Sequence, residues 1–264
     1  MTGQGEHTSH GGNPSHFEAM AAAYAGARPD YPAIVFETLR KFEVIGKDKA
    51  VLEIGAGTGE ATSTLVGAGC RVTAVEPGPR LAGLLTERVP QANVVAGRIE
   101  DLDLPACAFD AVLAATAMHW VDLTTTLPQL HRALRPRGRL AVWRTTFGDA
   151  SVATPFRRRL HEIVSRRAAH LNTDADVRGI RPTMRELVAT GHFAAHDSWE
   201  WPWSIRLTAD QIAALFLTFS DWSADEVAQA RAAVHDLGGS VVEHYRTILH
   251  LLDRVPDPVI STAG

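Results

Sequence analysis

The sequence predicts an α/β fold, a doubly wound and mostly parallel seven-stranded sheet with a helical lid. Short apolar segments alternate with amphipathic ones between residues 50 and 145, which is the pattern of βα units that build a parallel sheet. The segment 109–115 is apolar almost throughout, as a central strand buried on both faces should be. A Gly-x-Gly-x-Gly sequence begins at Gly55, directly after an apolar run, where a strand must turn sharply into a helix.

The chain ahead of the sheet falls into three parts. Residues 1–15 are rich in Gly, His, Ser and Asn, and we expect a flexible tail there. An Ala-rich segment at 17–27 and an amphipathic segment at 34–42 are expected to be helices. The turn between them, at 28–32, contains two prolines.

The parallel strands are expected to end at the same edge of the sheet, so that their carboxyl ends lie side by side. Its strands are predicted at 50–54, 71–75, 93–96, 109–115 and 139–145, and its helices at 59–67, 80–88 and 127–134. Ligands of such sheets bind outside the carboxyl ends of the strands. Gly55, Glu76, Gly97 and Ala115 all fall at that end, so we expect the binding site there.

After residue 147 the regular alternation stops. Helices are predicted at 154–170, 183–190, 209–219 and 224–237, and strands at 199–207 and 245–252. We expect the two late strands to complete the sheet and residues 148–240 to supply most of the lid helices. Residues 16–264 would then form a single domain.

Two features indicate a nucleoside-containing cofactor. The N-terminus of the helix after the glycine turn favours an anionic ligand group, and Glu76 ends the second strand, where a carboxylate can accept bonds from two ribose hydroxyls. The dinucleotide fingerprint would need its third glycine at residue 60, but that position is Glu60. An acidic side chain is a poor neighbour for a pyrophosphate, so a dinucleotide is disfavoured.

Four passages together resemble the class I methyltransferases that use S-adenosylmethionine, and more narrowly the small-molecule branch around trans-aconitate methyltransferase. The resemblance covers residues 17–147. The passages are Tyr24-x-x-x-Arg28-Pro29-x-Tyr31-Pro32, Glu53-x-Gly55-x-Gly57-x-Gly59, the run 97–102, and the stretch from Phe109-Asp110 to His119-Trp120.

The resemblance assigns cofactor contacts position by position. It implies that Glu53 and the backbone at Gly55, Ala56 and Gly57 hold the methionine end of S-adenosylmethionine, that Glu76 binds the ribose, and that Pro77, Ile99, Glu100 and Ala115 surround the rest of the cofactor. Many relatives have an aspartate where this chain has Arg98. The bond to the adenine amine would then pass to Glu100 or to the local backbone.

The residues that would contact the methyl acceptor are less clearly indicated than those that would contact the cofactor. His119 could orient or deprotonate the acceptor, since a histidine can serve as a general base near neutral pH, with Trp120 as a wall of the pocket. Alternatively, Trp120 belongs to the core and His119 is structural. Tyr24 and Arg28 either reach the cofactor carboxylate or the substrate, or they pack and cap the N-terminal helix.

The cluster Trp199, Trp201, Trp203, Phe216, Phe219 and Trp222 could line an apolar pocket or pack a late strand. The spacing of two places the three strand tryptophans on one face.

Composition narrows the range of partners. The net charge is -4, which gives no basic footprint for nucleic acid. We expect the arginines at 157–159 and 166–167 to form a solvated helix face. Cys70 and Cys107 are expected to be core residues rather than a disulfide or metal site. No membrane-spanning run or signal peptide is evident, and no metal ligand set stands near the expected site, so we expect a cytoplasmic enzyme without a metal.

These observations predict transfer of a methyl group to a small organic molecule, on the oxygen of a carboxylate or hydroxyl, with carbon or nitrogen acceptors next. Two other classes remain open. One is an enzyme of this fold that catalyses a cyclisation or isomerisation without methyl transfer. The other is a non-catalytic module that binds the cofactor.

Overall fold

The computed structural model describes residues 27–149, 151–167, 181–219 and 221–257. Seven strands form one sheet in the order β3-β2-β1-β4-β5-β7-β6. Strands β1 to β5 are parallel, and β7 and β6 run antiparallel at the far edge. The predicted α/β class and the two late strands are therefore confirmed.

The strands that end at the expected site lie close to their predicted positions. They are β1 (Ala50–Ile54), β2 (Arg71–Glu76), β3 (Asn93–Ala96), β4 (Phe109–Ala115) and β5 (Leu134–Phe147). β5 extends further at both ends than the predicted 139–145, and helix α6 (Leu123–Ala133) starts four residues earlier than expected. Asp122 explains that start, because its side chain accepts from the Thr124 N–H and caps the helix.

Helices cover both faces of the sheet. On one face α3 (Ala33–Lys41), α4 (Glu60–Gly67) and α5 (Pro79–Arg88) bury apolar residues such as Leu39, Leu65 and Leu85. On the other face α6 and α9 (Met184–Val188) bury Leu127, Leu130 and Leu187. This two-sided cover explains why β1 and β4 are apolar at most positions.

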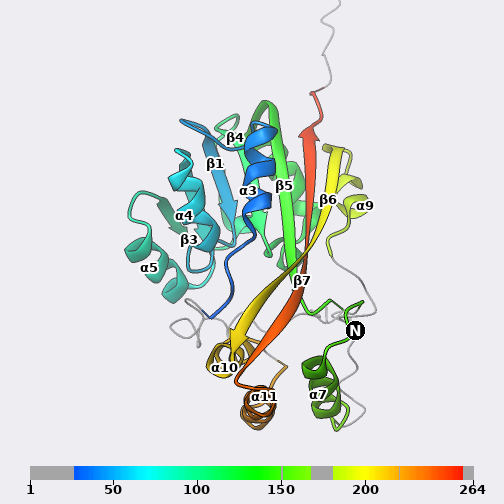
Figure 1. Ribbon diagram of the computed structural model, residues 1–264. Coiled ribbons are helices and arrows are strands. Elements are labelled where there is room, and N and C mark those ends of the chain that lie inside the picture. The colour runs from blue at the N-terminus through cyan, green and yellow to red at the C-terminus, as the bar shows by residue number, and fades with distance from the viewer. Residues whose placement is uncertain (1–26, 150, 168–180, 220, 258–264) are drawn as a thin grey trace, which may run out of the picture.

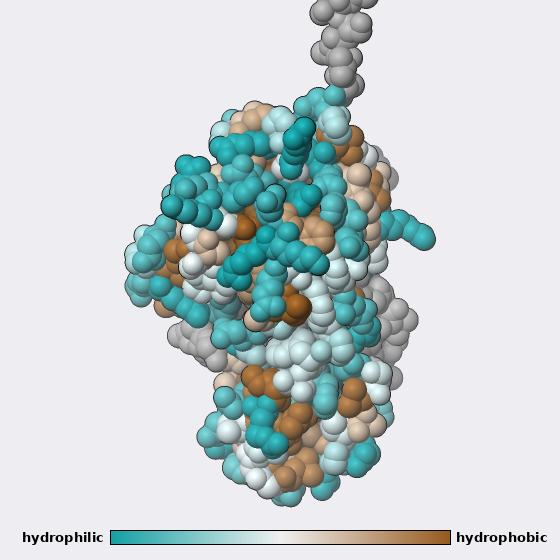
Figure 2. Space-filling model, turned by 45° about the horizontal axis from the view of Figure 1, so that its top comes forward, coloured by the Kyte–Doolittle hydropathy of each residue, from teal (hydrophilic) through white to brown (hydrophobic). Residues whose placement is uncertain are grey.

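The late strands are much longer than predicted. β6 (Phe193–Thr208) and β7 (Ser240–Arg254) continue past the rest of the sheet towards α10 (Ala209–Leu217) and α11 (Ala224–Asp236), as Figure 1 shows. These two helices and α7 (Pro155–Val164) share a third apolar cluster with the ends of the two strands. We call α7, α10, α11 and the adjoining ends of β6 and β7 the lower lobe. On the face shown in Figure 2, hydrophobic residues gather on the lower lobe, while the upper part is mostly hydrophilic.

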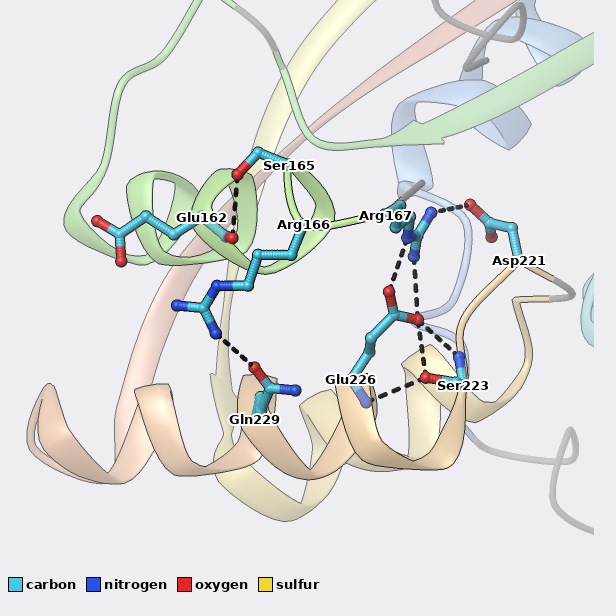
Figure 3. A network of polar contacts seen from close by, with 8 residues as sticks. All are labelled: Glu162, Ser165, Arg166, Arg167, Asp221, Ser223, Glu226 and Gln229. Carbon is cyan, nitrogen blue, oxygen red and sulfur yellow. Dashed lines mark hydrogen bonds and ion pairs between the residues drawn. The ribbon is translucent and has the colours of Figure 1, made fainter. Parts of the chain in front are cut away.

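A polar network joins the end of α7 to the start of α11 (Figure 3). The Arg167 guanidinium binds Glu226 at 2.8 Å and Asp221 at 3.2 Å, and Ser223 and Glu226 form a capping box at the start of α11. The guanidinium also lies 5.1 Å from the centre of the Trp222 ring. α7 ends at Val164, so the predicted helix 154–170 is too long: residues 165–167 are not helical, and residues 168–170 lie outside the described residues.

Three expectations about surface and core residues are corrected here. Arg157 and Arg167 do not belong to a solvated face, because both are partly buried and paired with carboxylates. Arg158, Arg159 and Arg166 are exposed as expected. Cys107 is exposed rather than part of the core, because it lies in a turn at φ 51°, while Cys70 is buried.

Candidate active site

The glycine turn brings β1 close to β2 and to the loop after β4. The N–H groups of Gly55 and Ala56 both donate to the Val75 carbonyl, at 2.8 and 3.1 Å. Gly55 has a φ of 64°, and a Cβ atom there would lie 2.5 Å from the Cβ of Ala117. A side chain at position 55 would therefore be strained and would also collide with its neighbour.

Glu76 is held at the end of β2 by the turn that it faces. Its Oε2 accepts from the Gly57 N–H at 2.8 Å, and its Oε1 accepts from the Gly78 N–H at 2.9 Å. The residue is 5% exposed and lines the adjoining cavity. The carboxylate is thus fixed by backbone donors.

Glu53 is a buried acid with an unused acceptor atom. It is 1% exposed, and its Oε2 accepts from the Thr62 hydroxyl at 2.7 Å. Its Oε1 has no hydrogen-bond partner among the residues that the structure describes. Burial raises the pKa of Glu53 to about 8. The hydrogen bond from Thr62 lowers this pKa, and the negative charges of Glu60 and Glu76 raise it. Loss of hydration disfavours the ionised form unless a cation arrives to compensate.

A cavity of about 580 Å³ opens at the carboxyl ends of the parallel strands, within the range of ~300–1,000 Å³ usual for small-molecule sites. It brings together every predicted site residue except Tyr24, which lies outside the described residues. These residues are Arg28, Glu53, Gly55, Ala56, Gly57, Glu76, Pro77, Ile99, Glu100, Ala115, His119 and Trp120. Their individual roles stay predictions.

The loops after β3 and β4 complete the predicted cofactor half. Oε1 of Glu100 accepts from the Asp122 N–H at 3.3 Å and from Arg98 at 3.2 Å. The Ala115 carbonyl accepts from the Tyr31 hydroxyl at 3.3 Å, so the N-terminal segment reaches the end of β4. Sequence reasoning placed Tyr31 in a family motif and assigned it no contact with the site.

His119 and Trp120 lie on the short 3-10 helix η2 (Met118–Trp120), with ring centres 4.7 Å apart. Trp120 is 37% exposed, so the core interpretation of this residue is wrong. The pKa of His119 falls to about 4, first through burial and then through the positive charges of Arg144 and Arg28. His119 is therefore neutral at pH 7 and can accept a proton or a hydrogen bond.

The far wall of the cavity comes from residues that sequence reasoning missed. Arg144, Thr145, Thr146 and Phe147 line it from the end of β5. The sequence could have indicated these residues, because the carboxyl end of β5 lies beside that of β4 when the two strands are parallel neighbours. Arg28 bridges to the lower lobe, because its Nε donates to the Thr218 hydroxyl at 3.3 Å and its guanidinium lies 5.6 Å from the Phe219 ring centre.

Most of the predicted aromatic cluster packs elsewhere. Of its six members, Phe219 alone lines the cavity. Trp199 and Trp201 stack 6.3 Å apart and pack against the core beside α3, whereas Trp203 stacks on Tyr245 at 4.5 Å. Phe216 and Trp222 belong to the lower cluster. The three strand tryptophans do share one face of β6, as their spacing predicts.

The sequence of the parallel core matches a known family. Residues 52–142 match the model described as a methyltransferase domain. Over these residues the chain is similar to a methyltransferase domain. The match spans β1 to the middle of β5, including the glycine turn, Glu76 and His119.

Curated relatives match about half of the chain. The chain is 39% identical over 130 residues to an uncharacterised methyltransferase of Mycobacterium tuberculosis H37Rv, a match that covers 49% of this chain and 52% of the relative. It is 31% identical over 127 residues to a demethylmenaquinone methyltransferase of Tropheryma whipplei, covering 47% and 53%. The chain thus spans about half the length of the curated relatives it matches.

Solved structures share the fold over most of the chain. A provisionally assigned type II methyltransferase of Anaeromyxobacter dehalogenans has a TM-score of 0.60 at 22% identity, covering 87% of this chain and 99% of that one. A geranyl diphosphate methyltransferase solved with S-adenosylmethionine has a TM-score of 0.51 at 14% identity, covering 96% of both. At these identities the likeness establishes the fold alone.

No group of three or more His, Cys, Asp or Glu side chains among the described residues is arranged to hold a metal ion. Within the same residues, every helix is too short or too polar to cross a membrane.

Proposed function

We propose that this chain is an S-adenosylmethionine-dependent methyltransferase that methylates an oxygen atom, of a carboxylate or a hydroxyl, in a small organic molecule. The observation that carries the proposal is a single cavity that runs from Glu76 and the glycine turn to His119 and Trp120. One end presents the groups that a nucleoside cofactor needs, and the other end offers room for a second reactant.

The residues of the cofactor end fit S-adenosylmethionine. The turn at Gly55 lets a ligand approach the backbone closely, Glu76 would hold the ribose, and the unpaired Oε1 of Glu53 would face the methionine ammonium. A cation at Glu53 would supply the missing partner of a fully buried acid. When bound, S-adenosylmethionine supplies an electrophilic methyl group on a sulfonium, which an oxygen nucleophile displaces from the sulfur.

The residues of the acceptor end would bind and orient the acceptor and would exclude water from it. Trp120, Phe147 and Phe219 provide apolar and aromatic walls, which would keep an acceptor in position and out of bulk solvent. A carboxylate acceptor is already ionised near pH 7 and loses no proton. With a hydroxyl acceptor, the neutral ring of His119 would take up the hydroxyl proton.

Names of relatives support a small organic acceptor. A demethylmenaquinone methyltransferase and a geranyl diphosphate methyltransferase occur among them. The lower lobe would act as the lid of one domain spanning residues 16–264, with Phe219 at the cavity wall. Carbon and nitrogen acceptors remain the alternatives within methyl transfer.

Calorimetric titration with S-adenosylmethionine and S-adenosylhomocysteine tests the proposal first. Micromolar binding, about -8 kcal/mol, is expected, followed by formation of S-adenosylhomocysteine with an acceptor from a panel of small carboxylic acids and phenols. A folded sample that binds neither compound would overturn the cofactor assignment. Binding without S-adenosylhomocysteine formation, together with chemical change of an acceptor, would instead establish a cyclase or isomerase.

A further inference from the structure

Arg144 is a partly buried cation at the wall of the cavity. It lies on β5 and also lines a small recess beside the cavity, together with His119 and His250. Its Nη1 donates to the Arg181 carbonyl at 3.3 Å. Within the described residues, its guanidinium has no carboxylate at ion-pair distance.

Six other arginines of the described residues that are at least partly shielded do have such a partner. Each of the following is shielded from solvent at least in part and lies beside an aspartate or glutamate: Arg135, Arg139, Arg157, Arg167, Arg246 and Arg254. A guanidinium that loses hydration is costly unless an anion compensates it. Arg144 therefore differs from these six arginines of the described residues.

The charged groups around Arg144 include a second cation and no anion that compensates its charge. Burial and the charge of Arg28 lower the pKa of Arg144, and no acidic group opposes them. His119 is neutral. Four acids line the cavity, Glu53, Glu60, Glu76 and Glu100, and none of them lies at ion-pair distance from Arg144. Glu53 and Glu76 belong to β1 and β2, and β5 lies two strands beyond β1 in the sheet, a separation of about 10 Å.

We infer that Arg144 binds an anionic group of the methyl acceptor, a carboxylate or a phosphate, in the part of the cavity bounded by Phe147 and Trp120. The inference rests on the proposed function, because it takes the Glu76 end of the cavity to hold the cofactor. A planar guanidinium fits both anions with paired hydrogen bonds. The aromatic walls beside it favour an acceptor whose remainder is apolar.

Binding of matched probes to the protein saturated with S-adenosylhomocysteine tests the inference. The probes are phenylacetate, phenyl phosphate and the uncharged phenylacetamide, titrated by calorimetry up to millimolar concentration. We expect at least one anion to bind about tenfold more tightly than the amide, equivalent to about 1.4 kcal/mol. Comparison of the two anions distinguishes a carboxylate site from a phosphate site.

Variants assign the preference to Arg144. Arg144→Gln retains a donor for the Arg181 carbonyl and should remove the preference for the anion while leaving S-adenosylhomocysteine affinity unchanged. Arg158→Gln is the charge-matched control, because Arg158 is exposed on α7, and it should behave as wild type. The inference is overturned if the amide binds as well as both anions, if neither anion binds saturably, or if Arg144→Gln keeps the preference. Failure of S-adenosylhomocysteine to bind is a separate result, which overturns the proposed function.

Discussion

Arg157 on α7 holds the buried carboxylate of Glu243 on β7, with Nη2 and Nε at 2.6 and 3.0 Å from its Oε2. The side chain of Glu243 is fully buried, whereas that of Arg157 is 26% exposed. The same guanidinium lies 4.3 Å from the centre of the Phe147 ring, and Phe147 lines the cavity. The pair therefore links the lower lobe to a wall of the candidate active site.

Removing Arg157 should destabilise the protein strongly. Arg157→Leu leaves the buried Glu243 carboxylate without its cation, and loss of one partner of such a pair typically costs about 3–5 kcal/mol. Urea denaturation measures the change in free energy of unfolding. Arg159→Leu is the control, since Arg159 is exposed on the same helix. The double variant with Glu243→Leu should recover most of the loss, and an unaltered midpoint in Arg157→Leu would contradict a structural role for the pair.

Glu53 should make folding stability depend on pH. Its pKa is raised from 4.5 to about 8 in the folded chain, so the folded state keeps a proton that the unfolded state releases. Its contribution to stability is full below pH 4.5 and is lost as the pH rises towards 8, by an amount on the order of a few kcal/mol. Denaturation of wild type and Glu53→Gln across this range should give curves that diverge as the pH rises, with the variant relatively more stable at pH 8. Parallel curves would show that Glu53 does not titrate in this way.

Binding of S-adenosylmethionine should release a proton at pH 7. A methionine ammonium beside Glu53 favours the ionised carboxylate, so the affinity should rise with pH until Glu53 is ionised in the free protein, at about pH 8. Calorimetry in two buffers of different ionisation enthalpy counts the protons released. Glu53→Gln should release none, and a wild type that releases none would contradict the proposed contact.

Glu76→Ala should weaken S-adenosylmethionine binding by about tenfold or more, because a ribose loses its acceptor and two backbone donors lose theirs. Glu87→Ala provides the control, since Glu87 is exposed on the adjacent α5. Titration calorimetry on folded samples measures both. Equal affinities in the two variants would show that the cofactor does not bind at the end of β2.

His119→Ala should lower turnover more than cofactor affinity. The ring lies in the acceptor part of the cavity, and its pKa of about 4 keeps it neutral at physiological pH. An acidic limb of kcat/KM caused by His119 should therefore fall near pH 4 rather than 6.5. A variant that unfolds while its folded fraction keeps full activity would show that His119 is structural.

The sequence predicted the structure most accurately within single βα units. The strands at 50–54 and 109–115 and the glycine turn follow from apolar runs and turn chemistry, which are properties of neighbouring residues. Errors occurred where a distant contact sets the boundary. β6 and β7 extend well beyond their predicted ends because they pair with each other at fifteen positions, a pairing that neither segment encodes alone.

The sequence by itself determined the α/β class, the glycine turn and the end of the sheet where the cavity opens, because these depend on short-range patterns and on the rule that parallel strands end together. Tertiary structure alone decided which charges lack partners. Arg144, Arg157 and Arg167 look alike in the sequence, yet carboxylates from distant segments neutralise the last two and not the first. Pairing of a buried charge depends on which segments fold against it, and this is the reason that the role proposed for Arg144 emerged only from the structure.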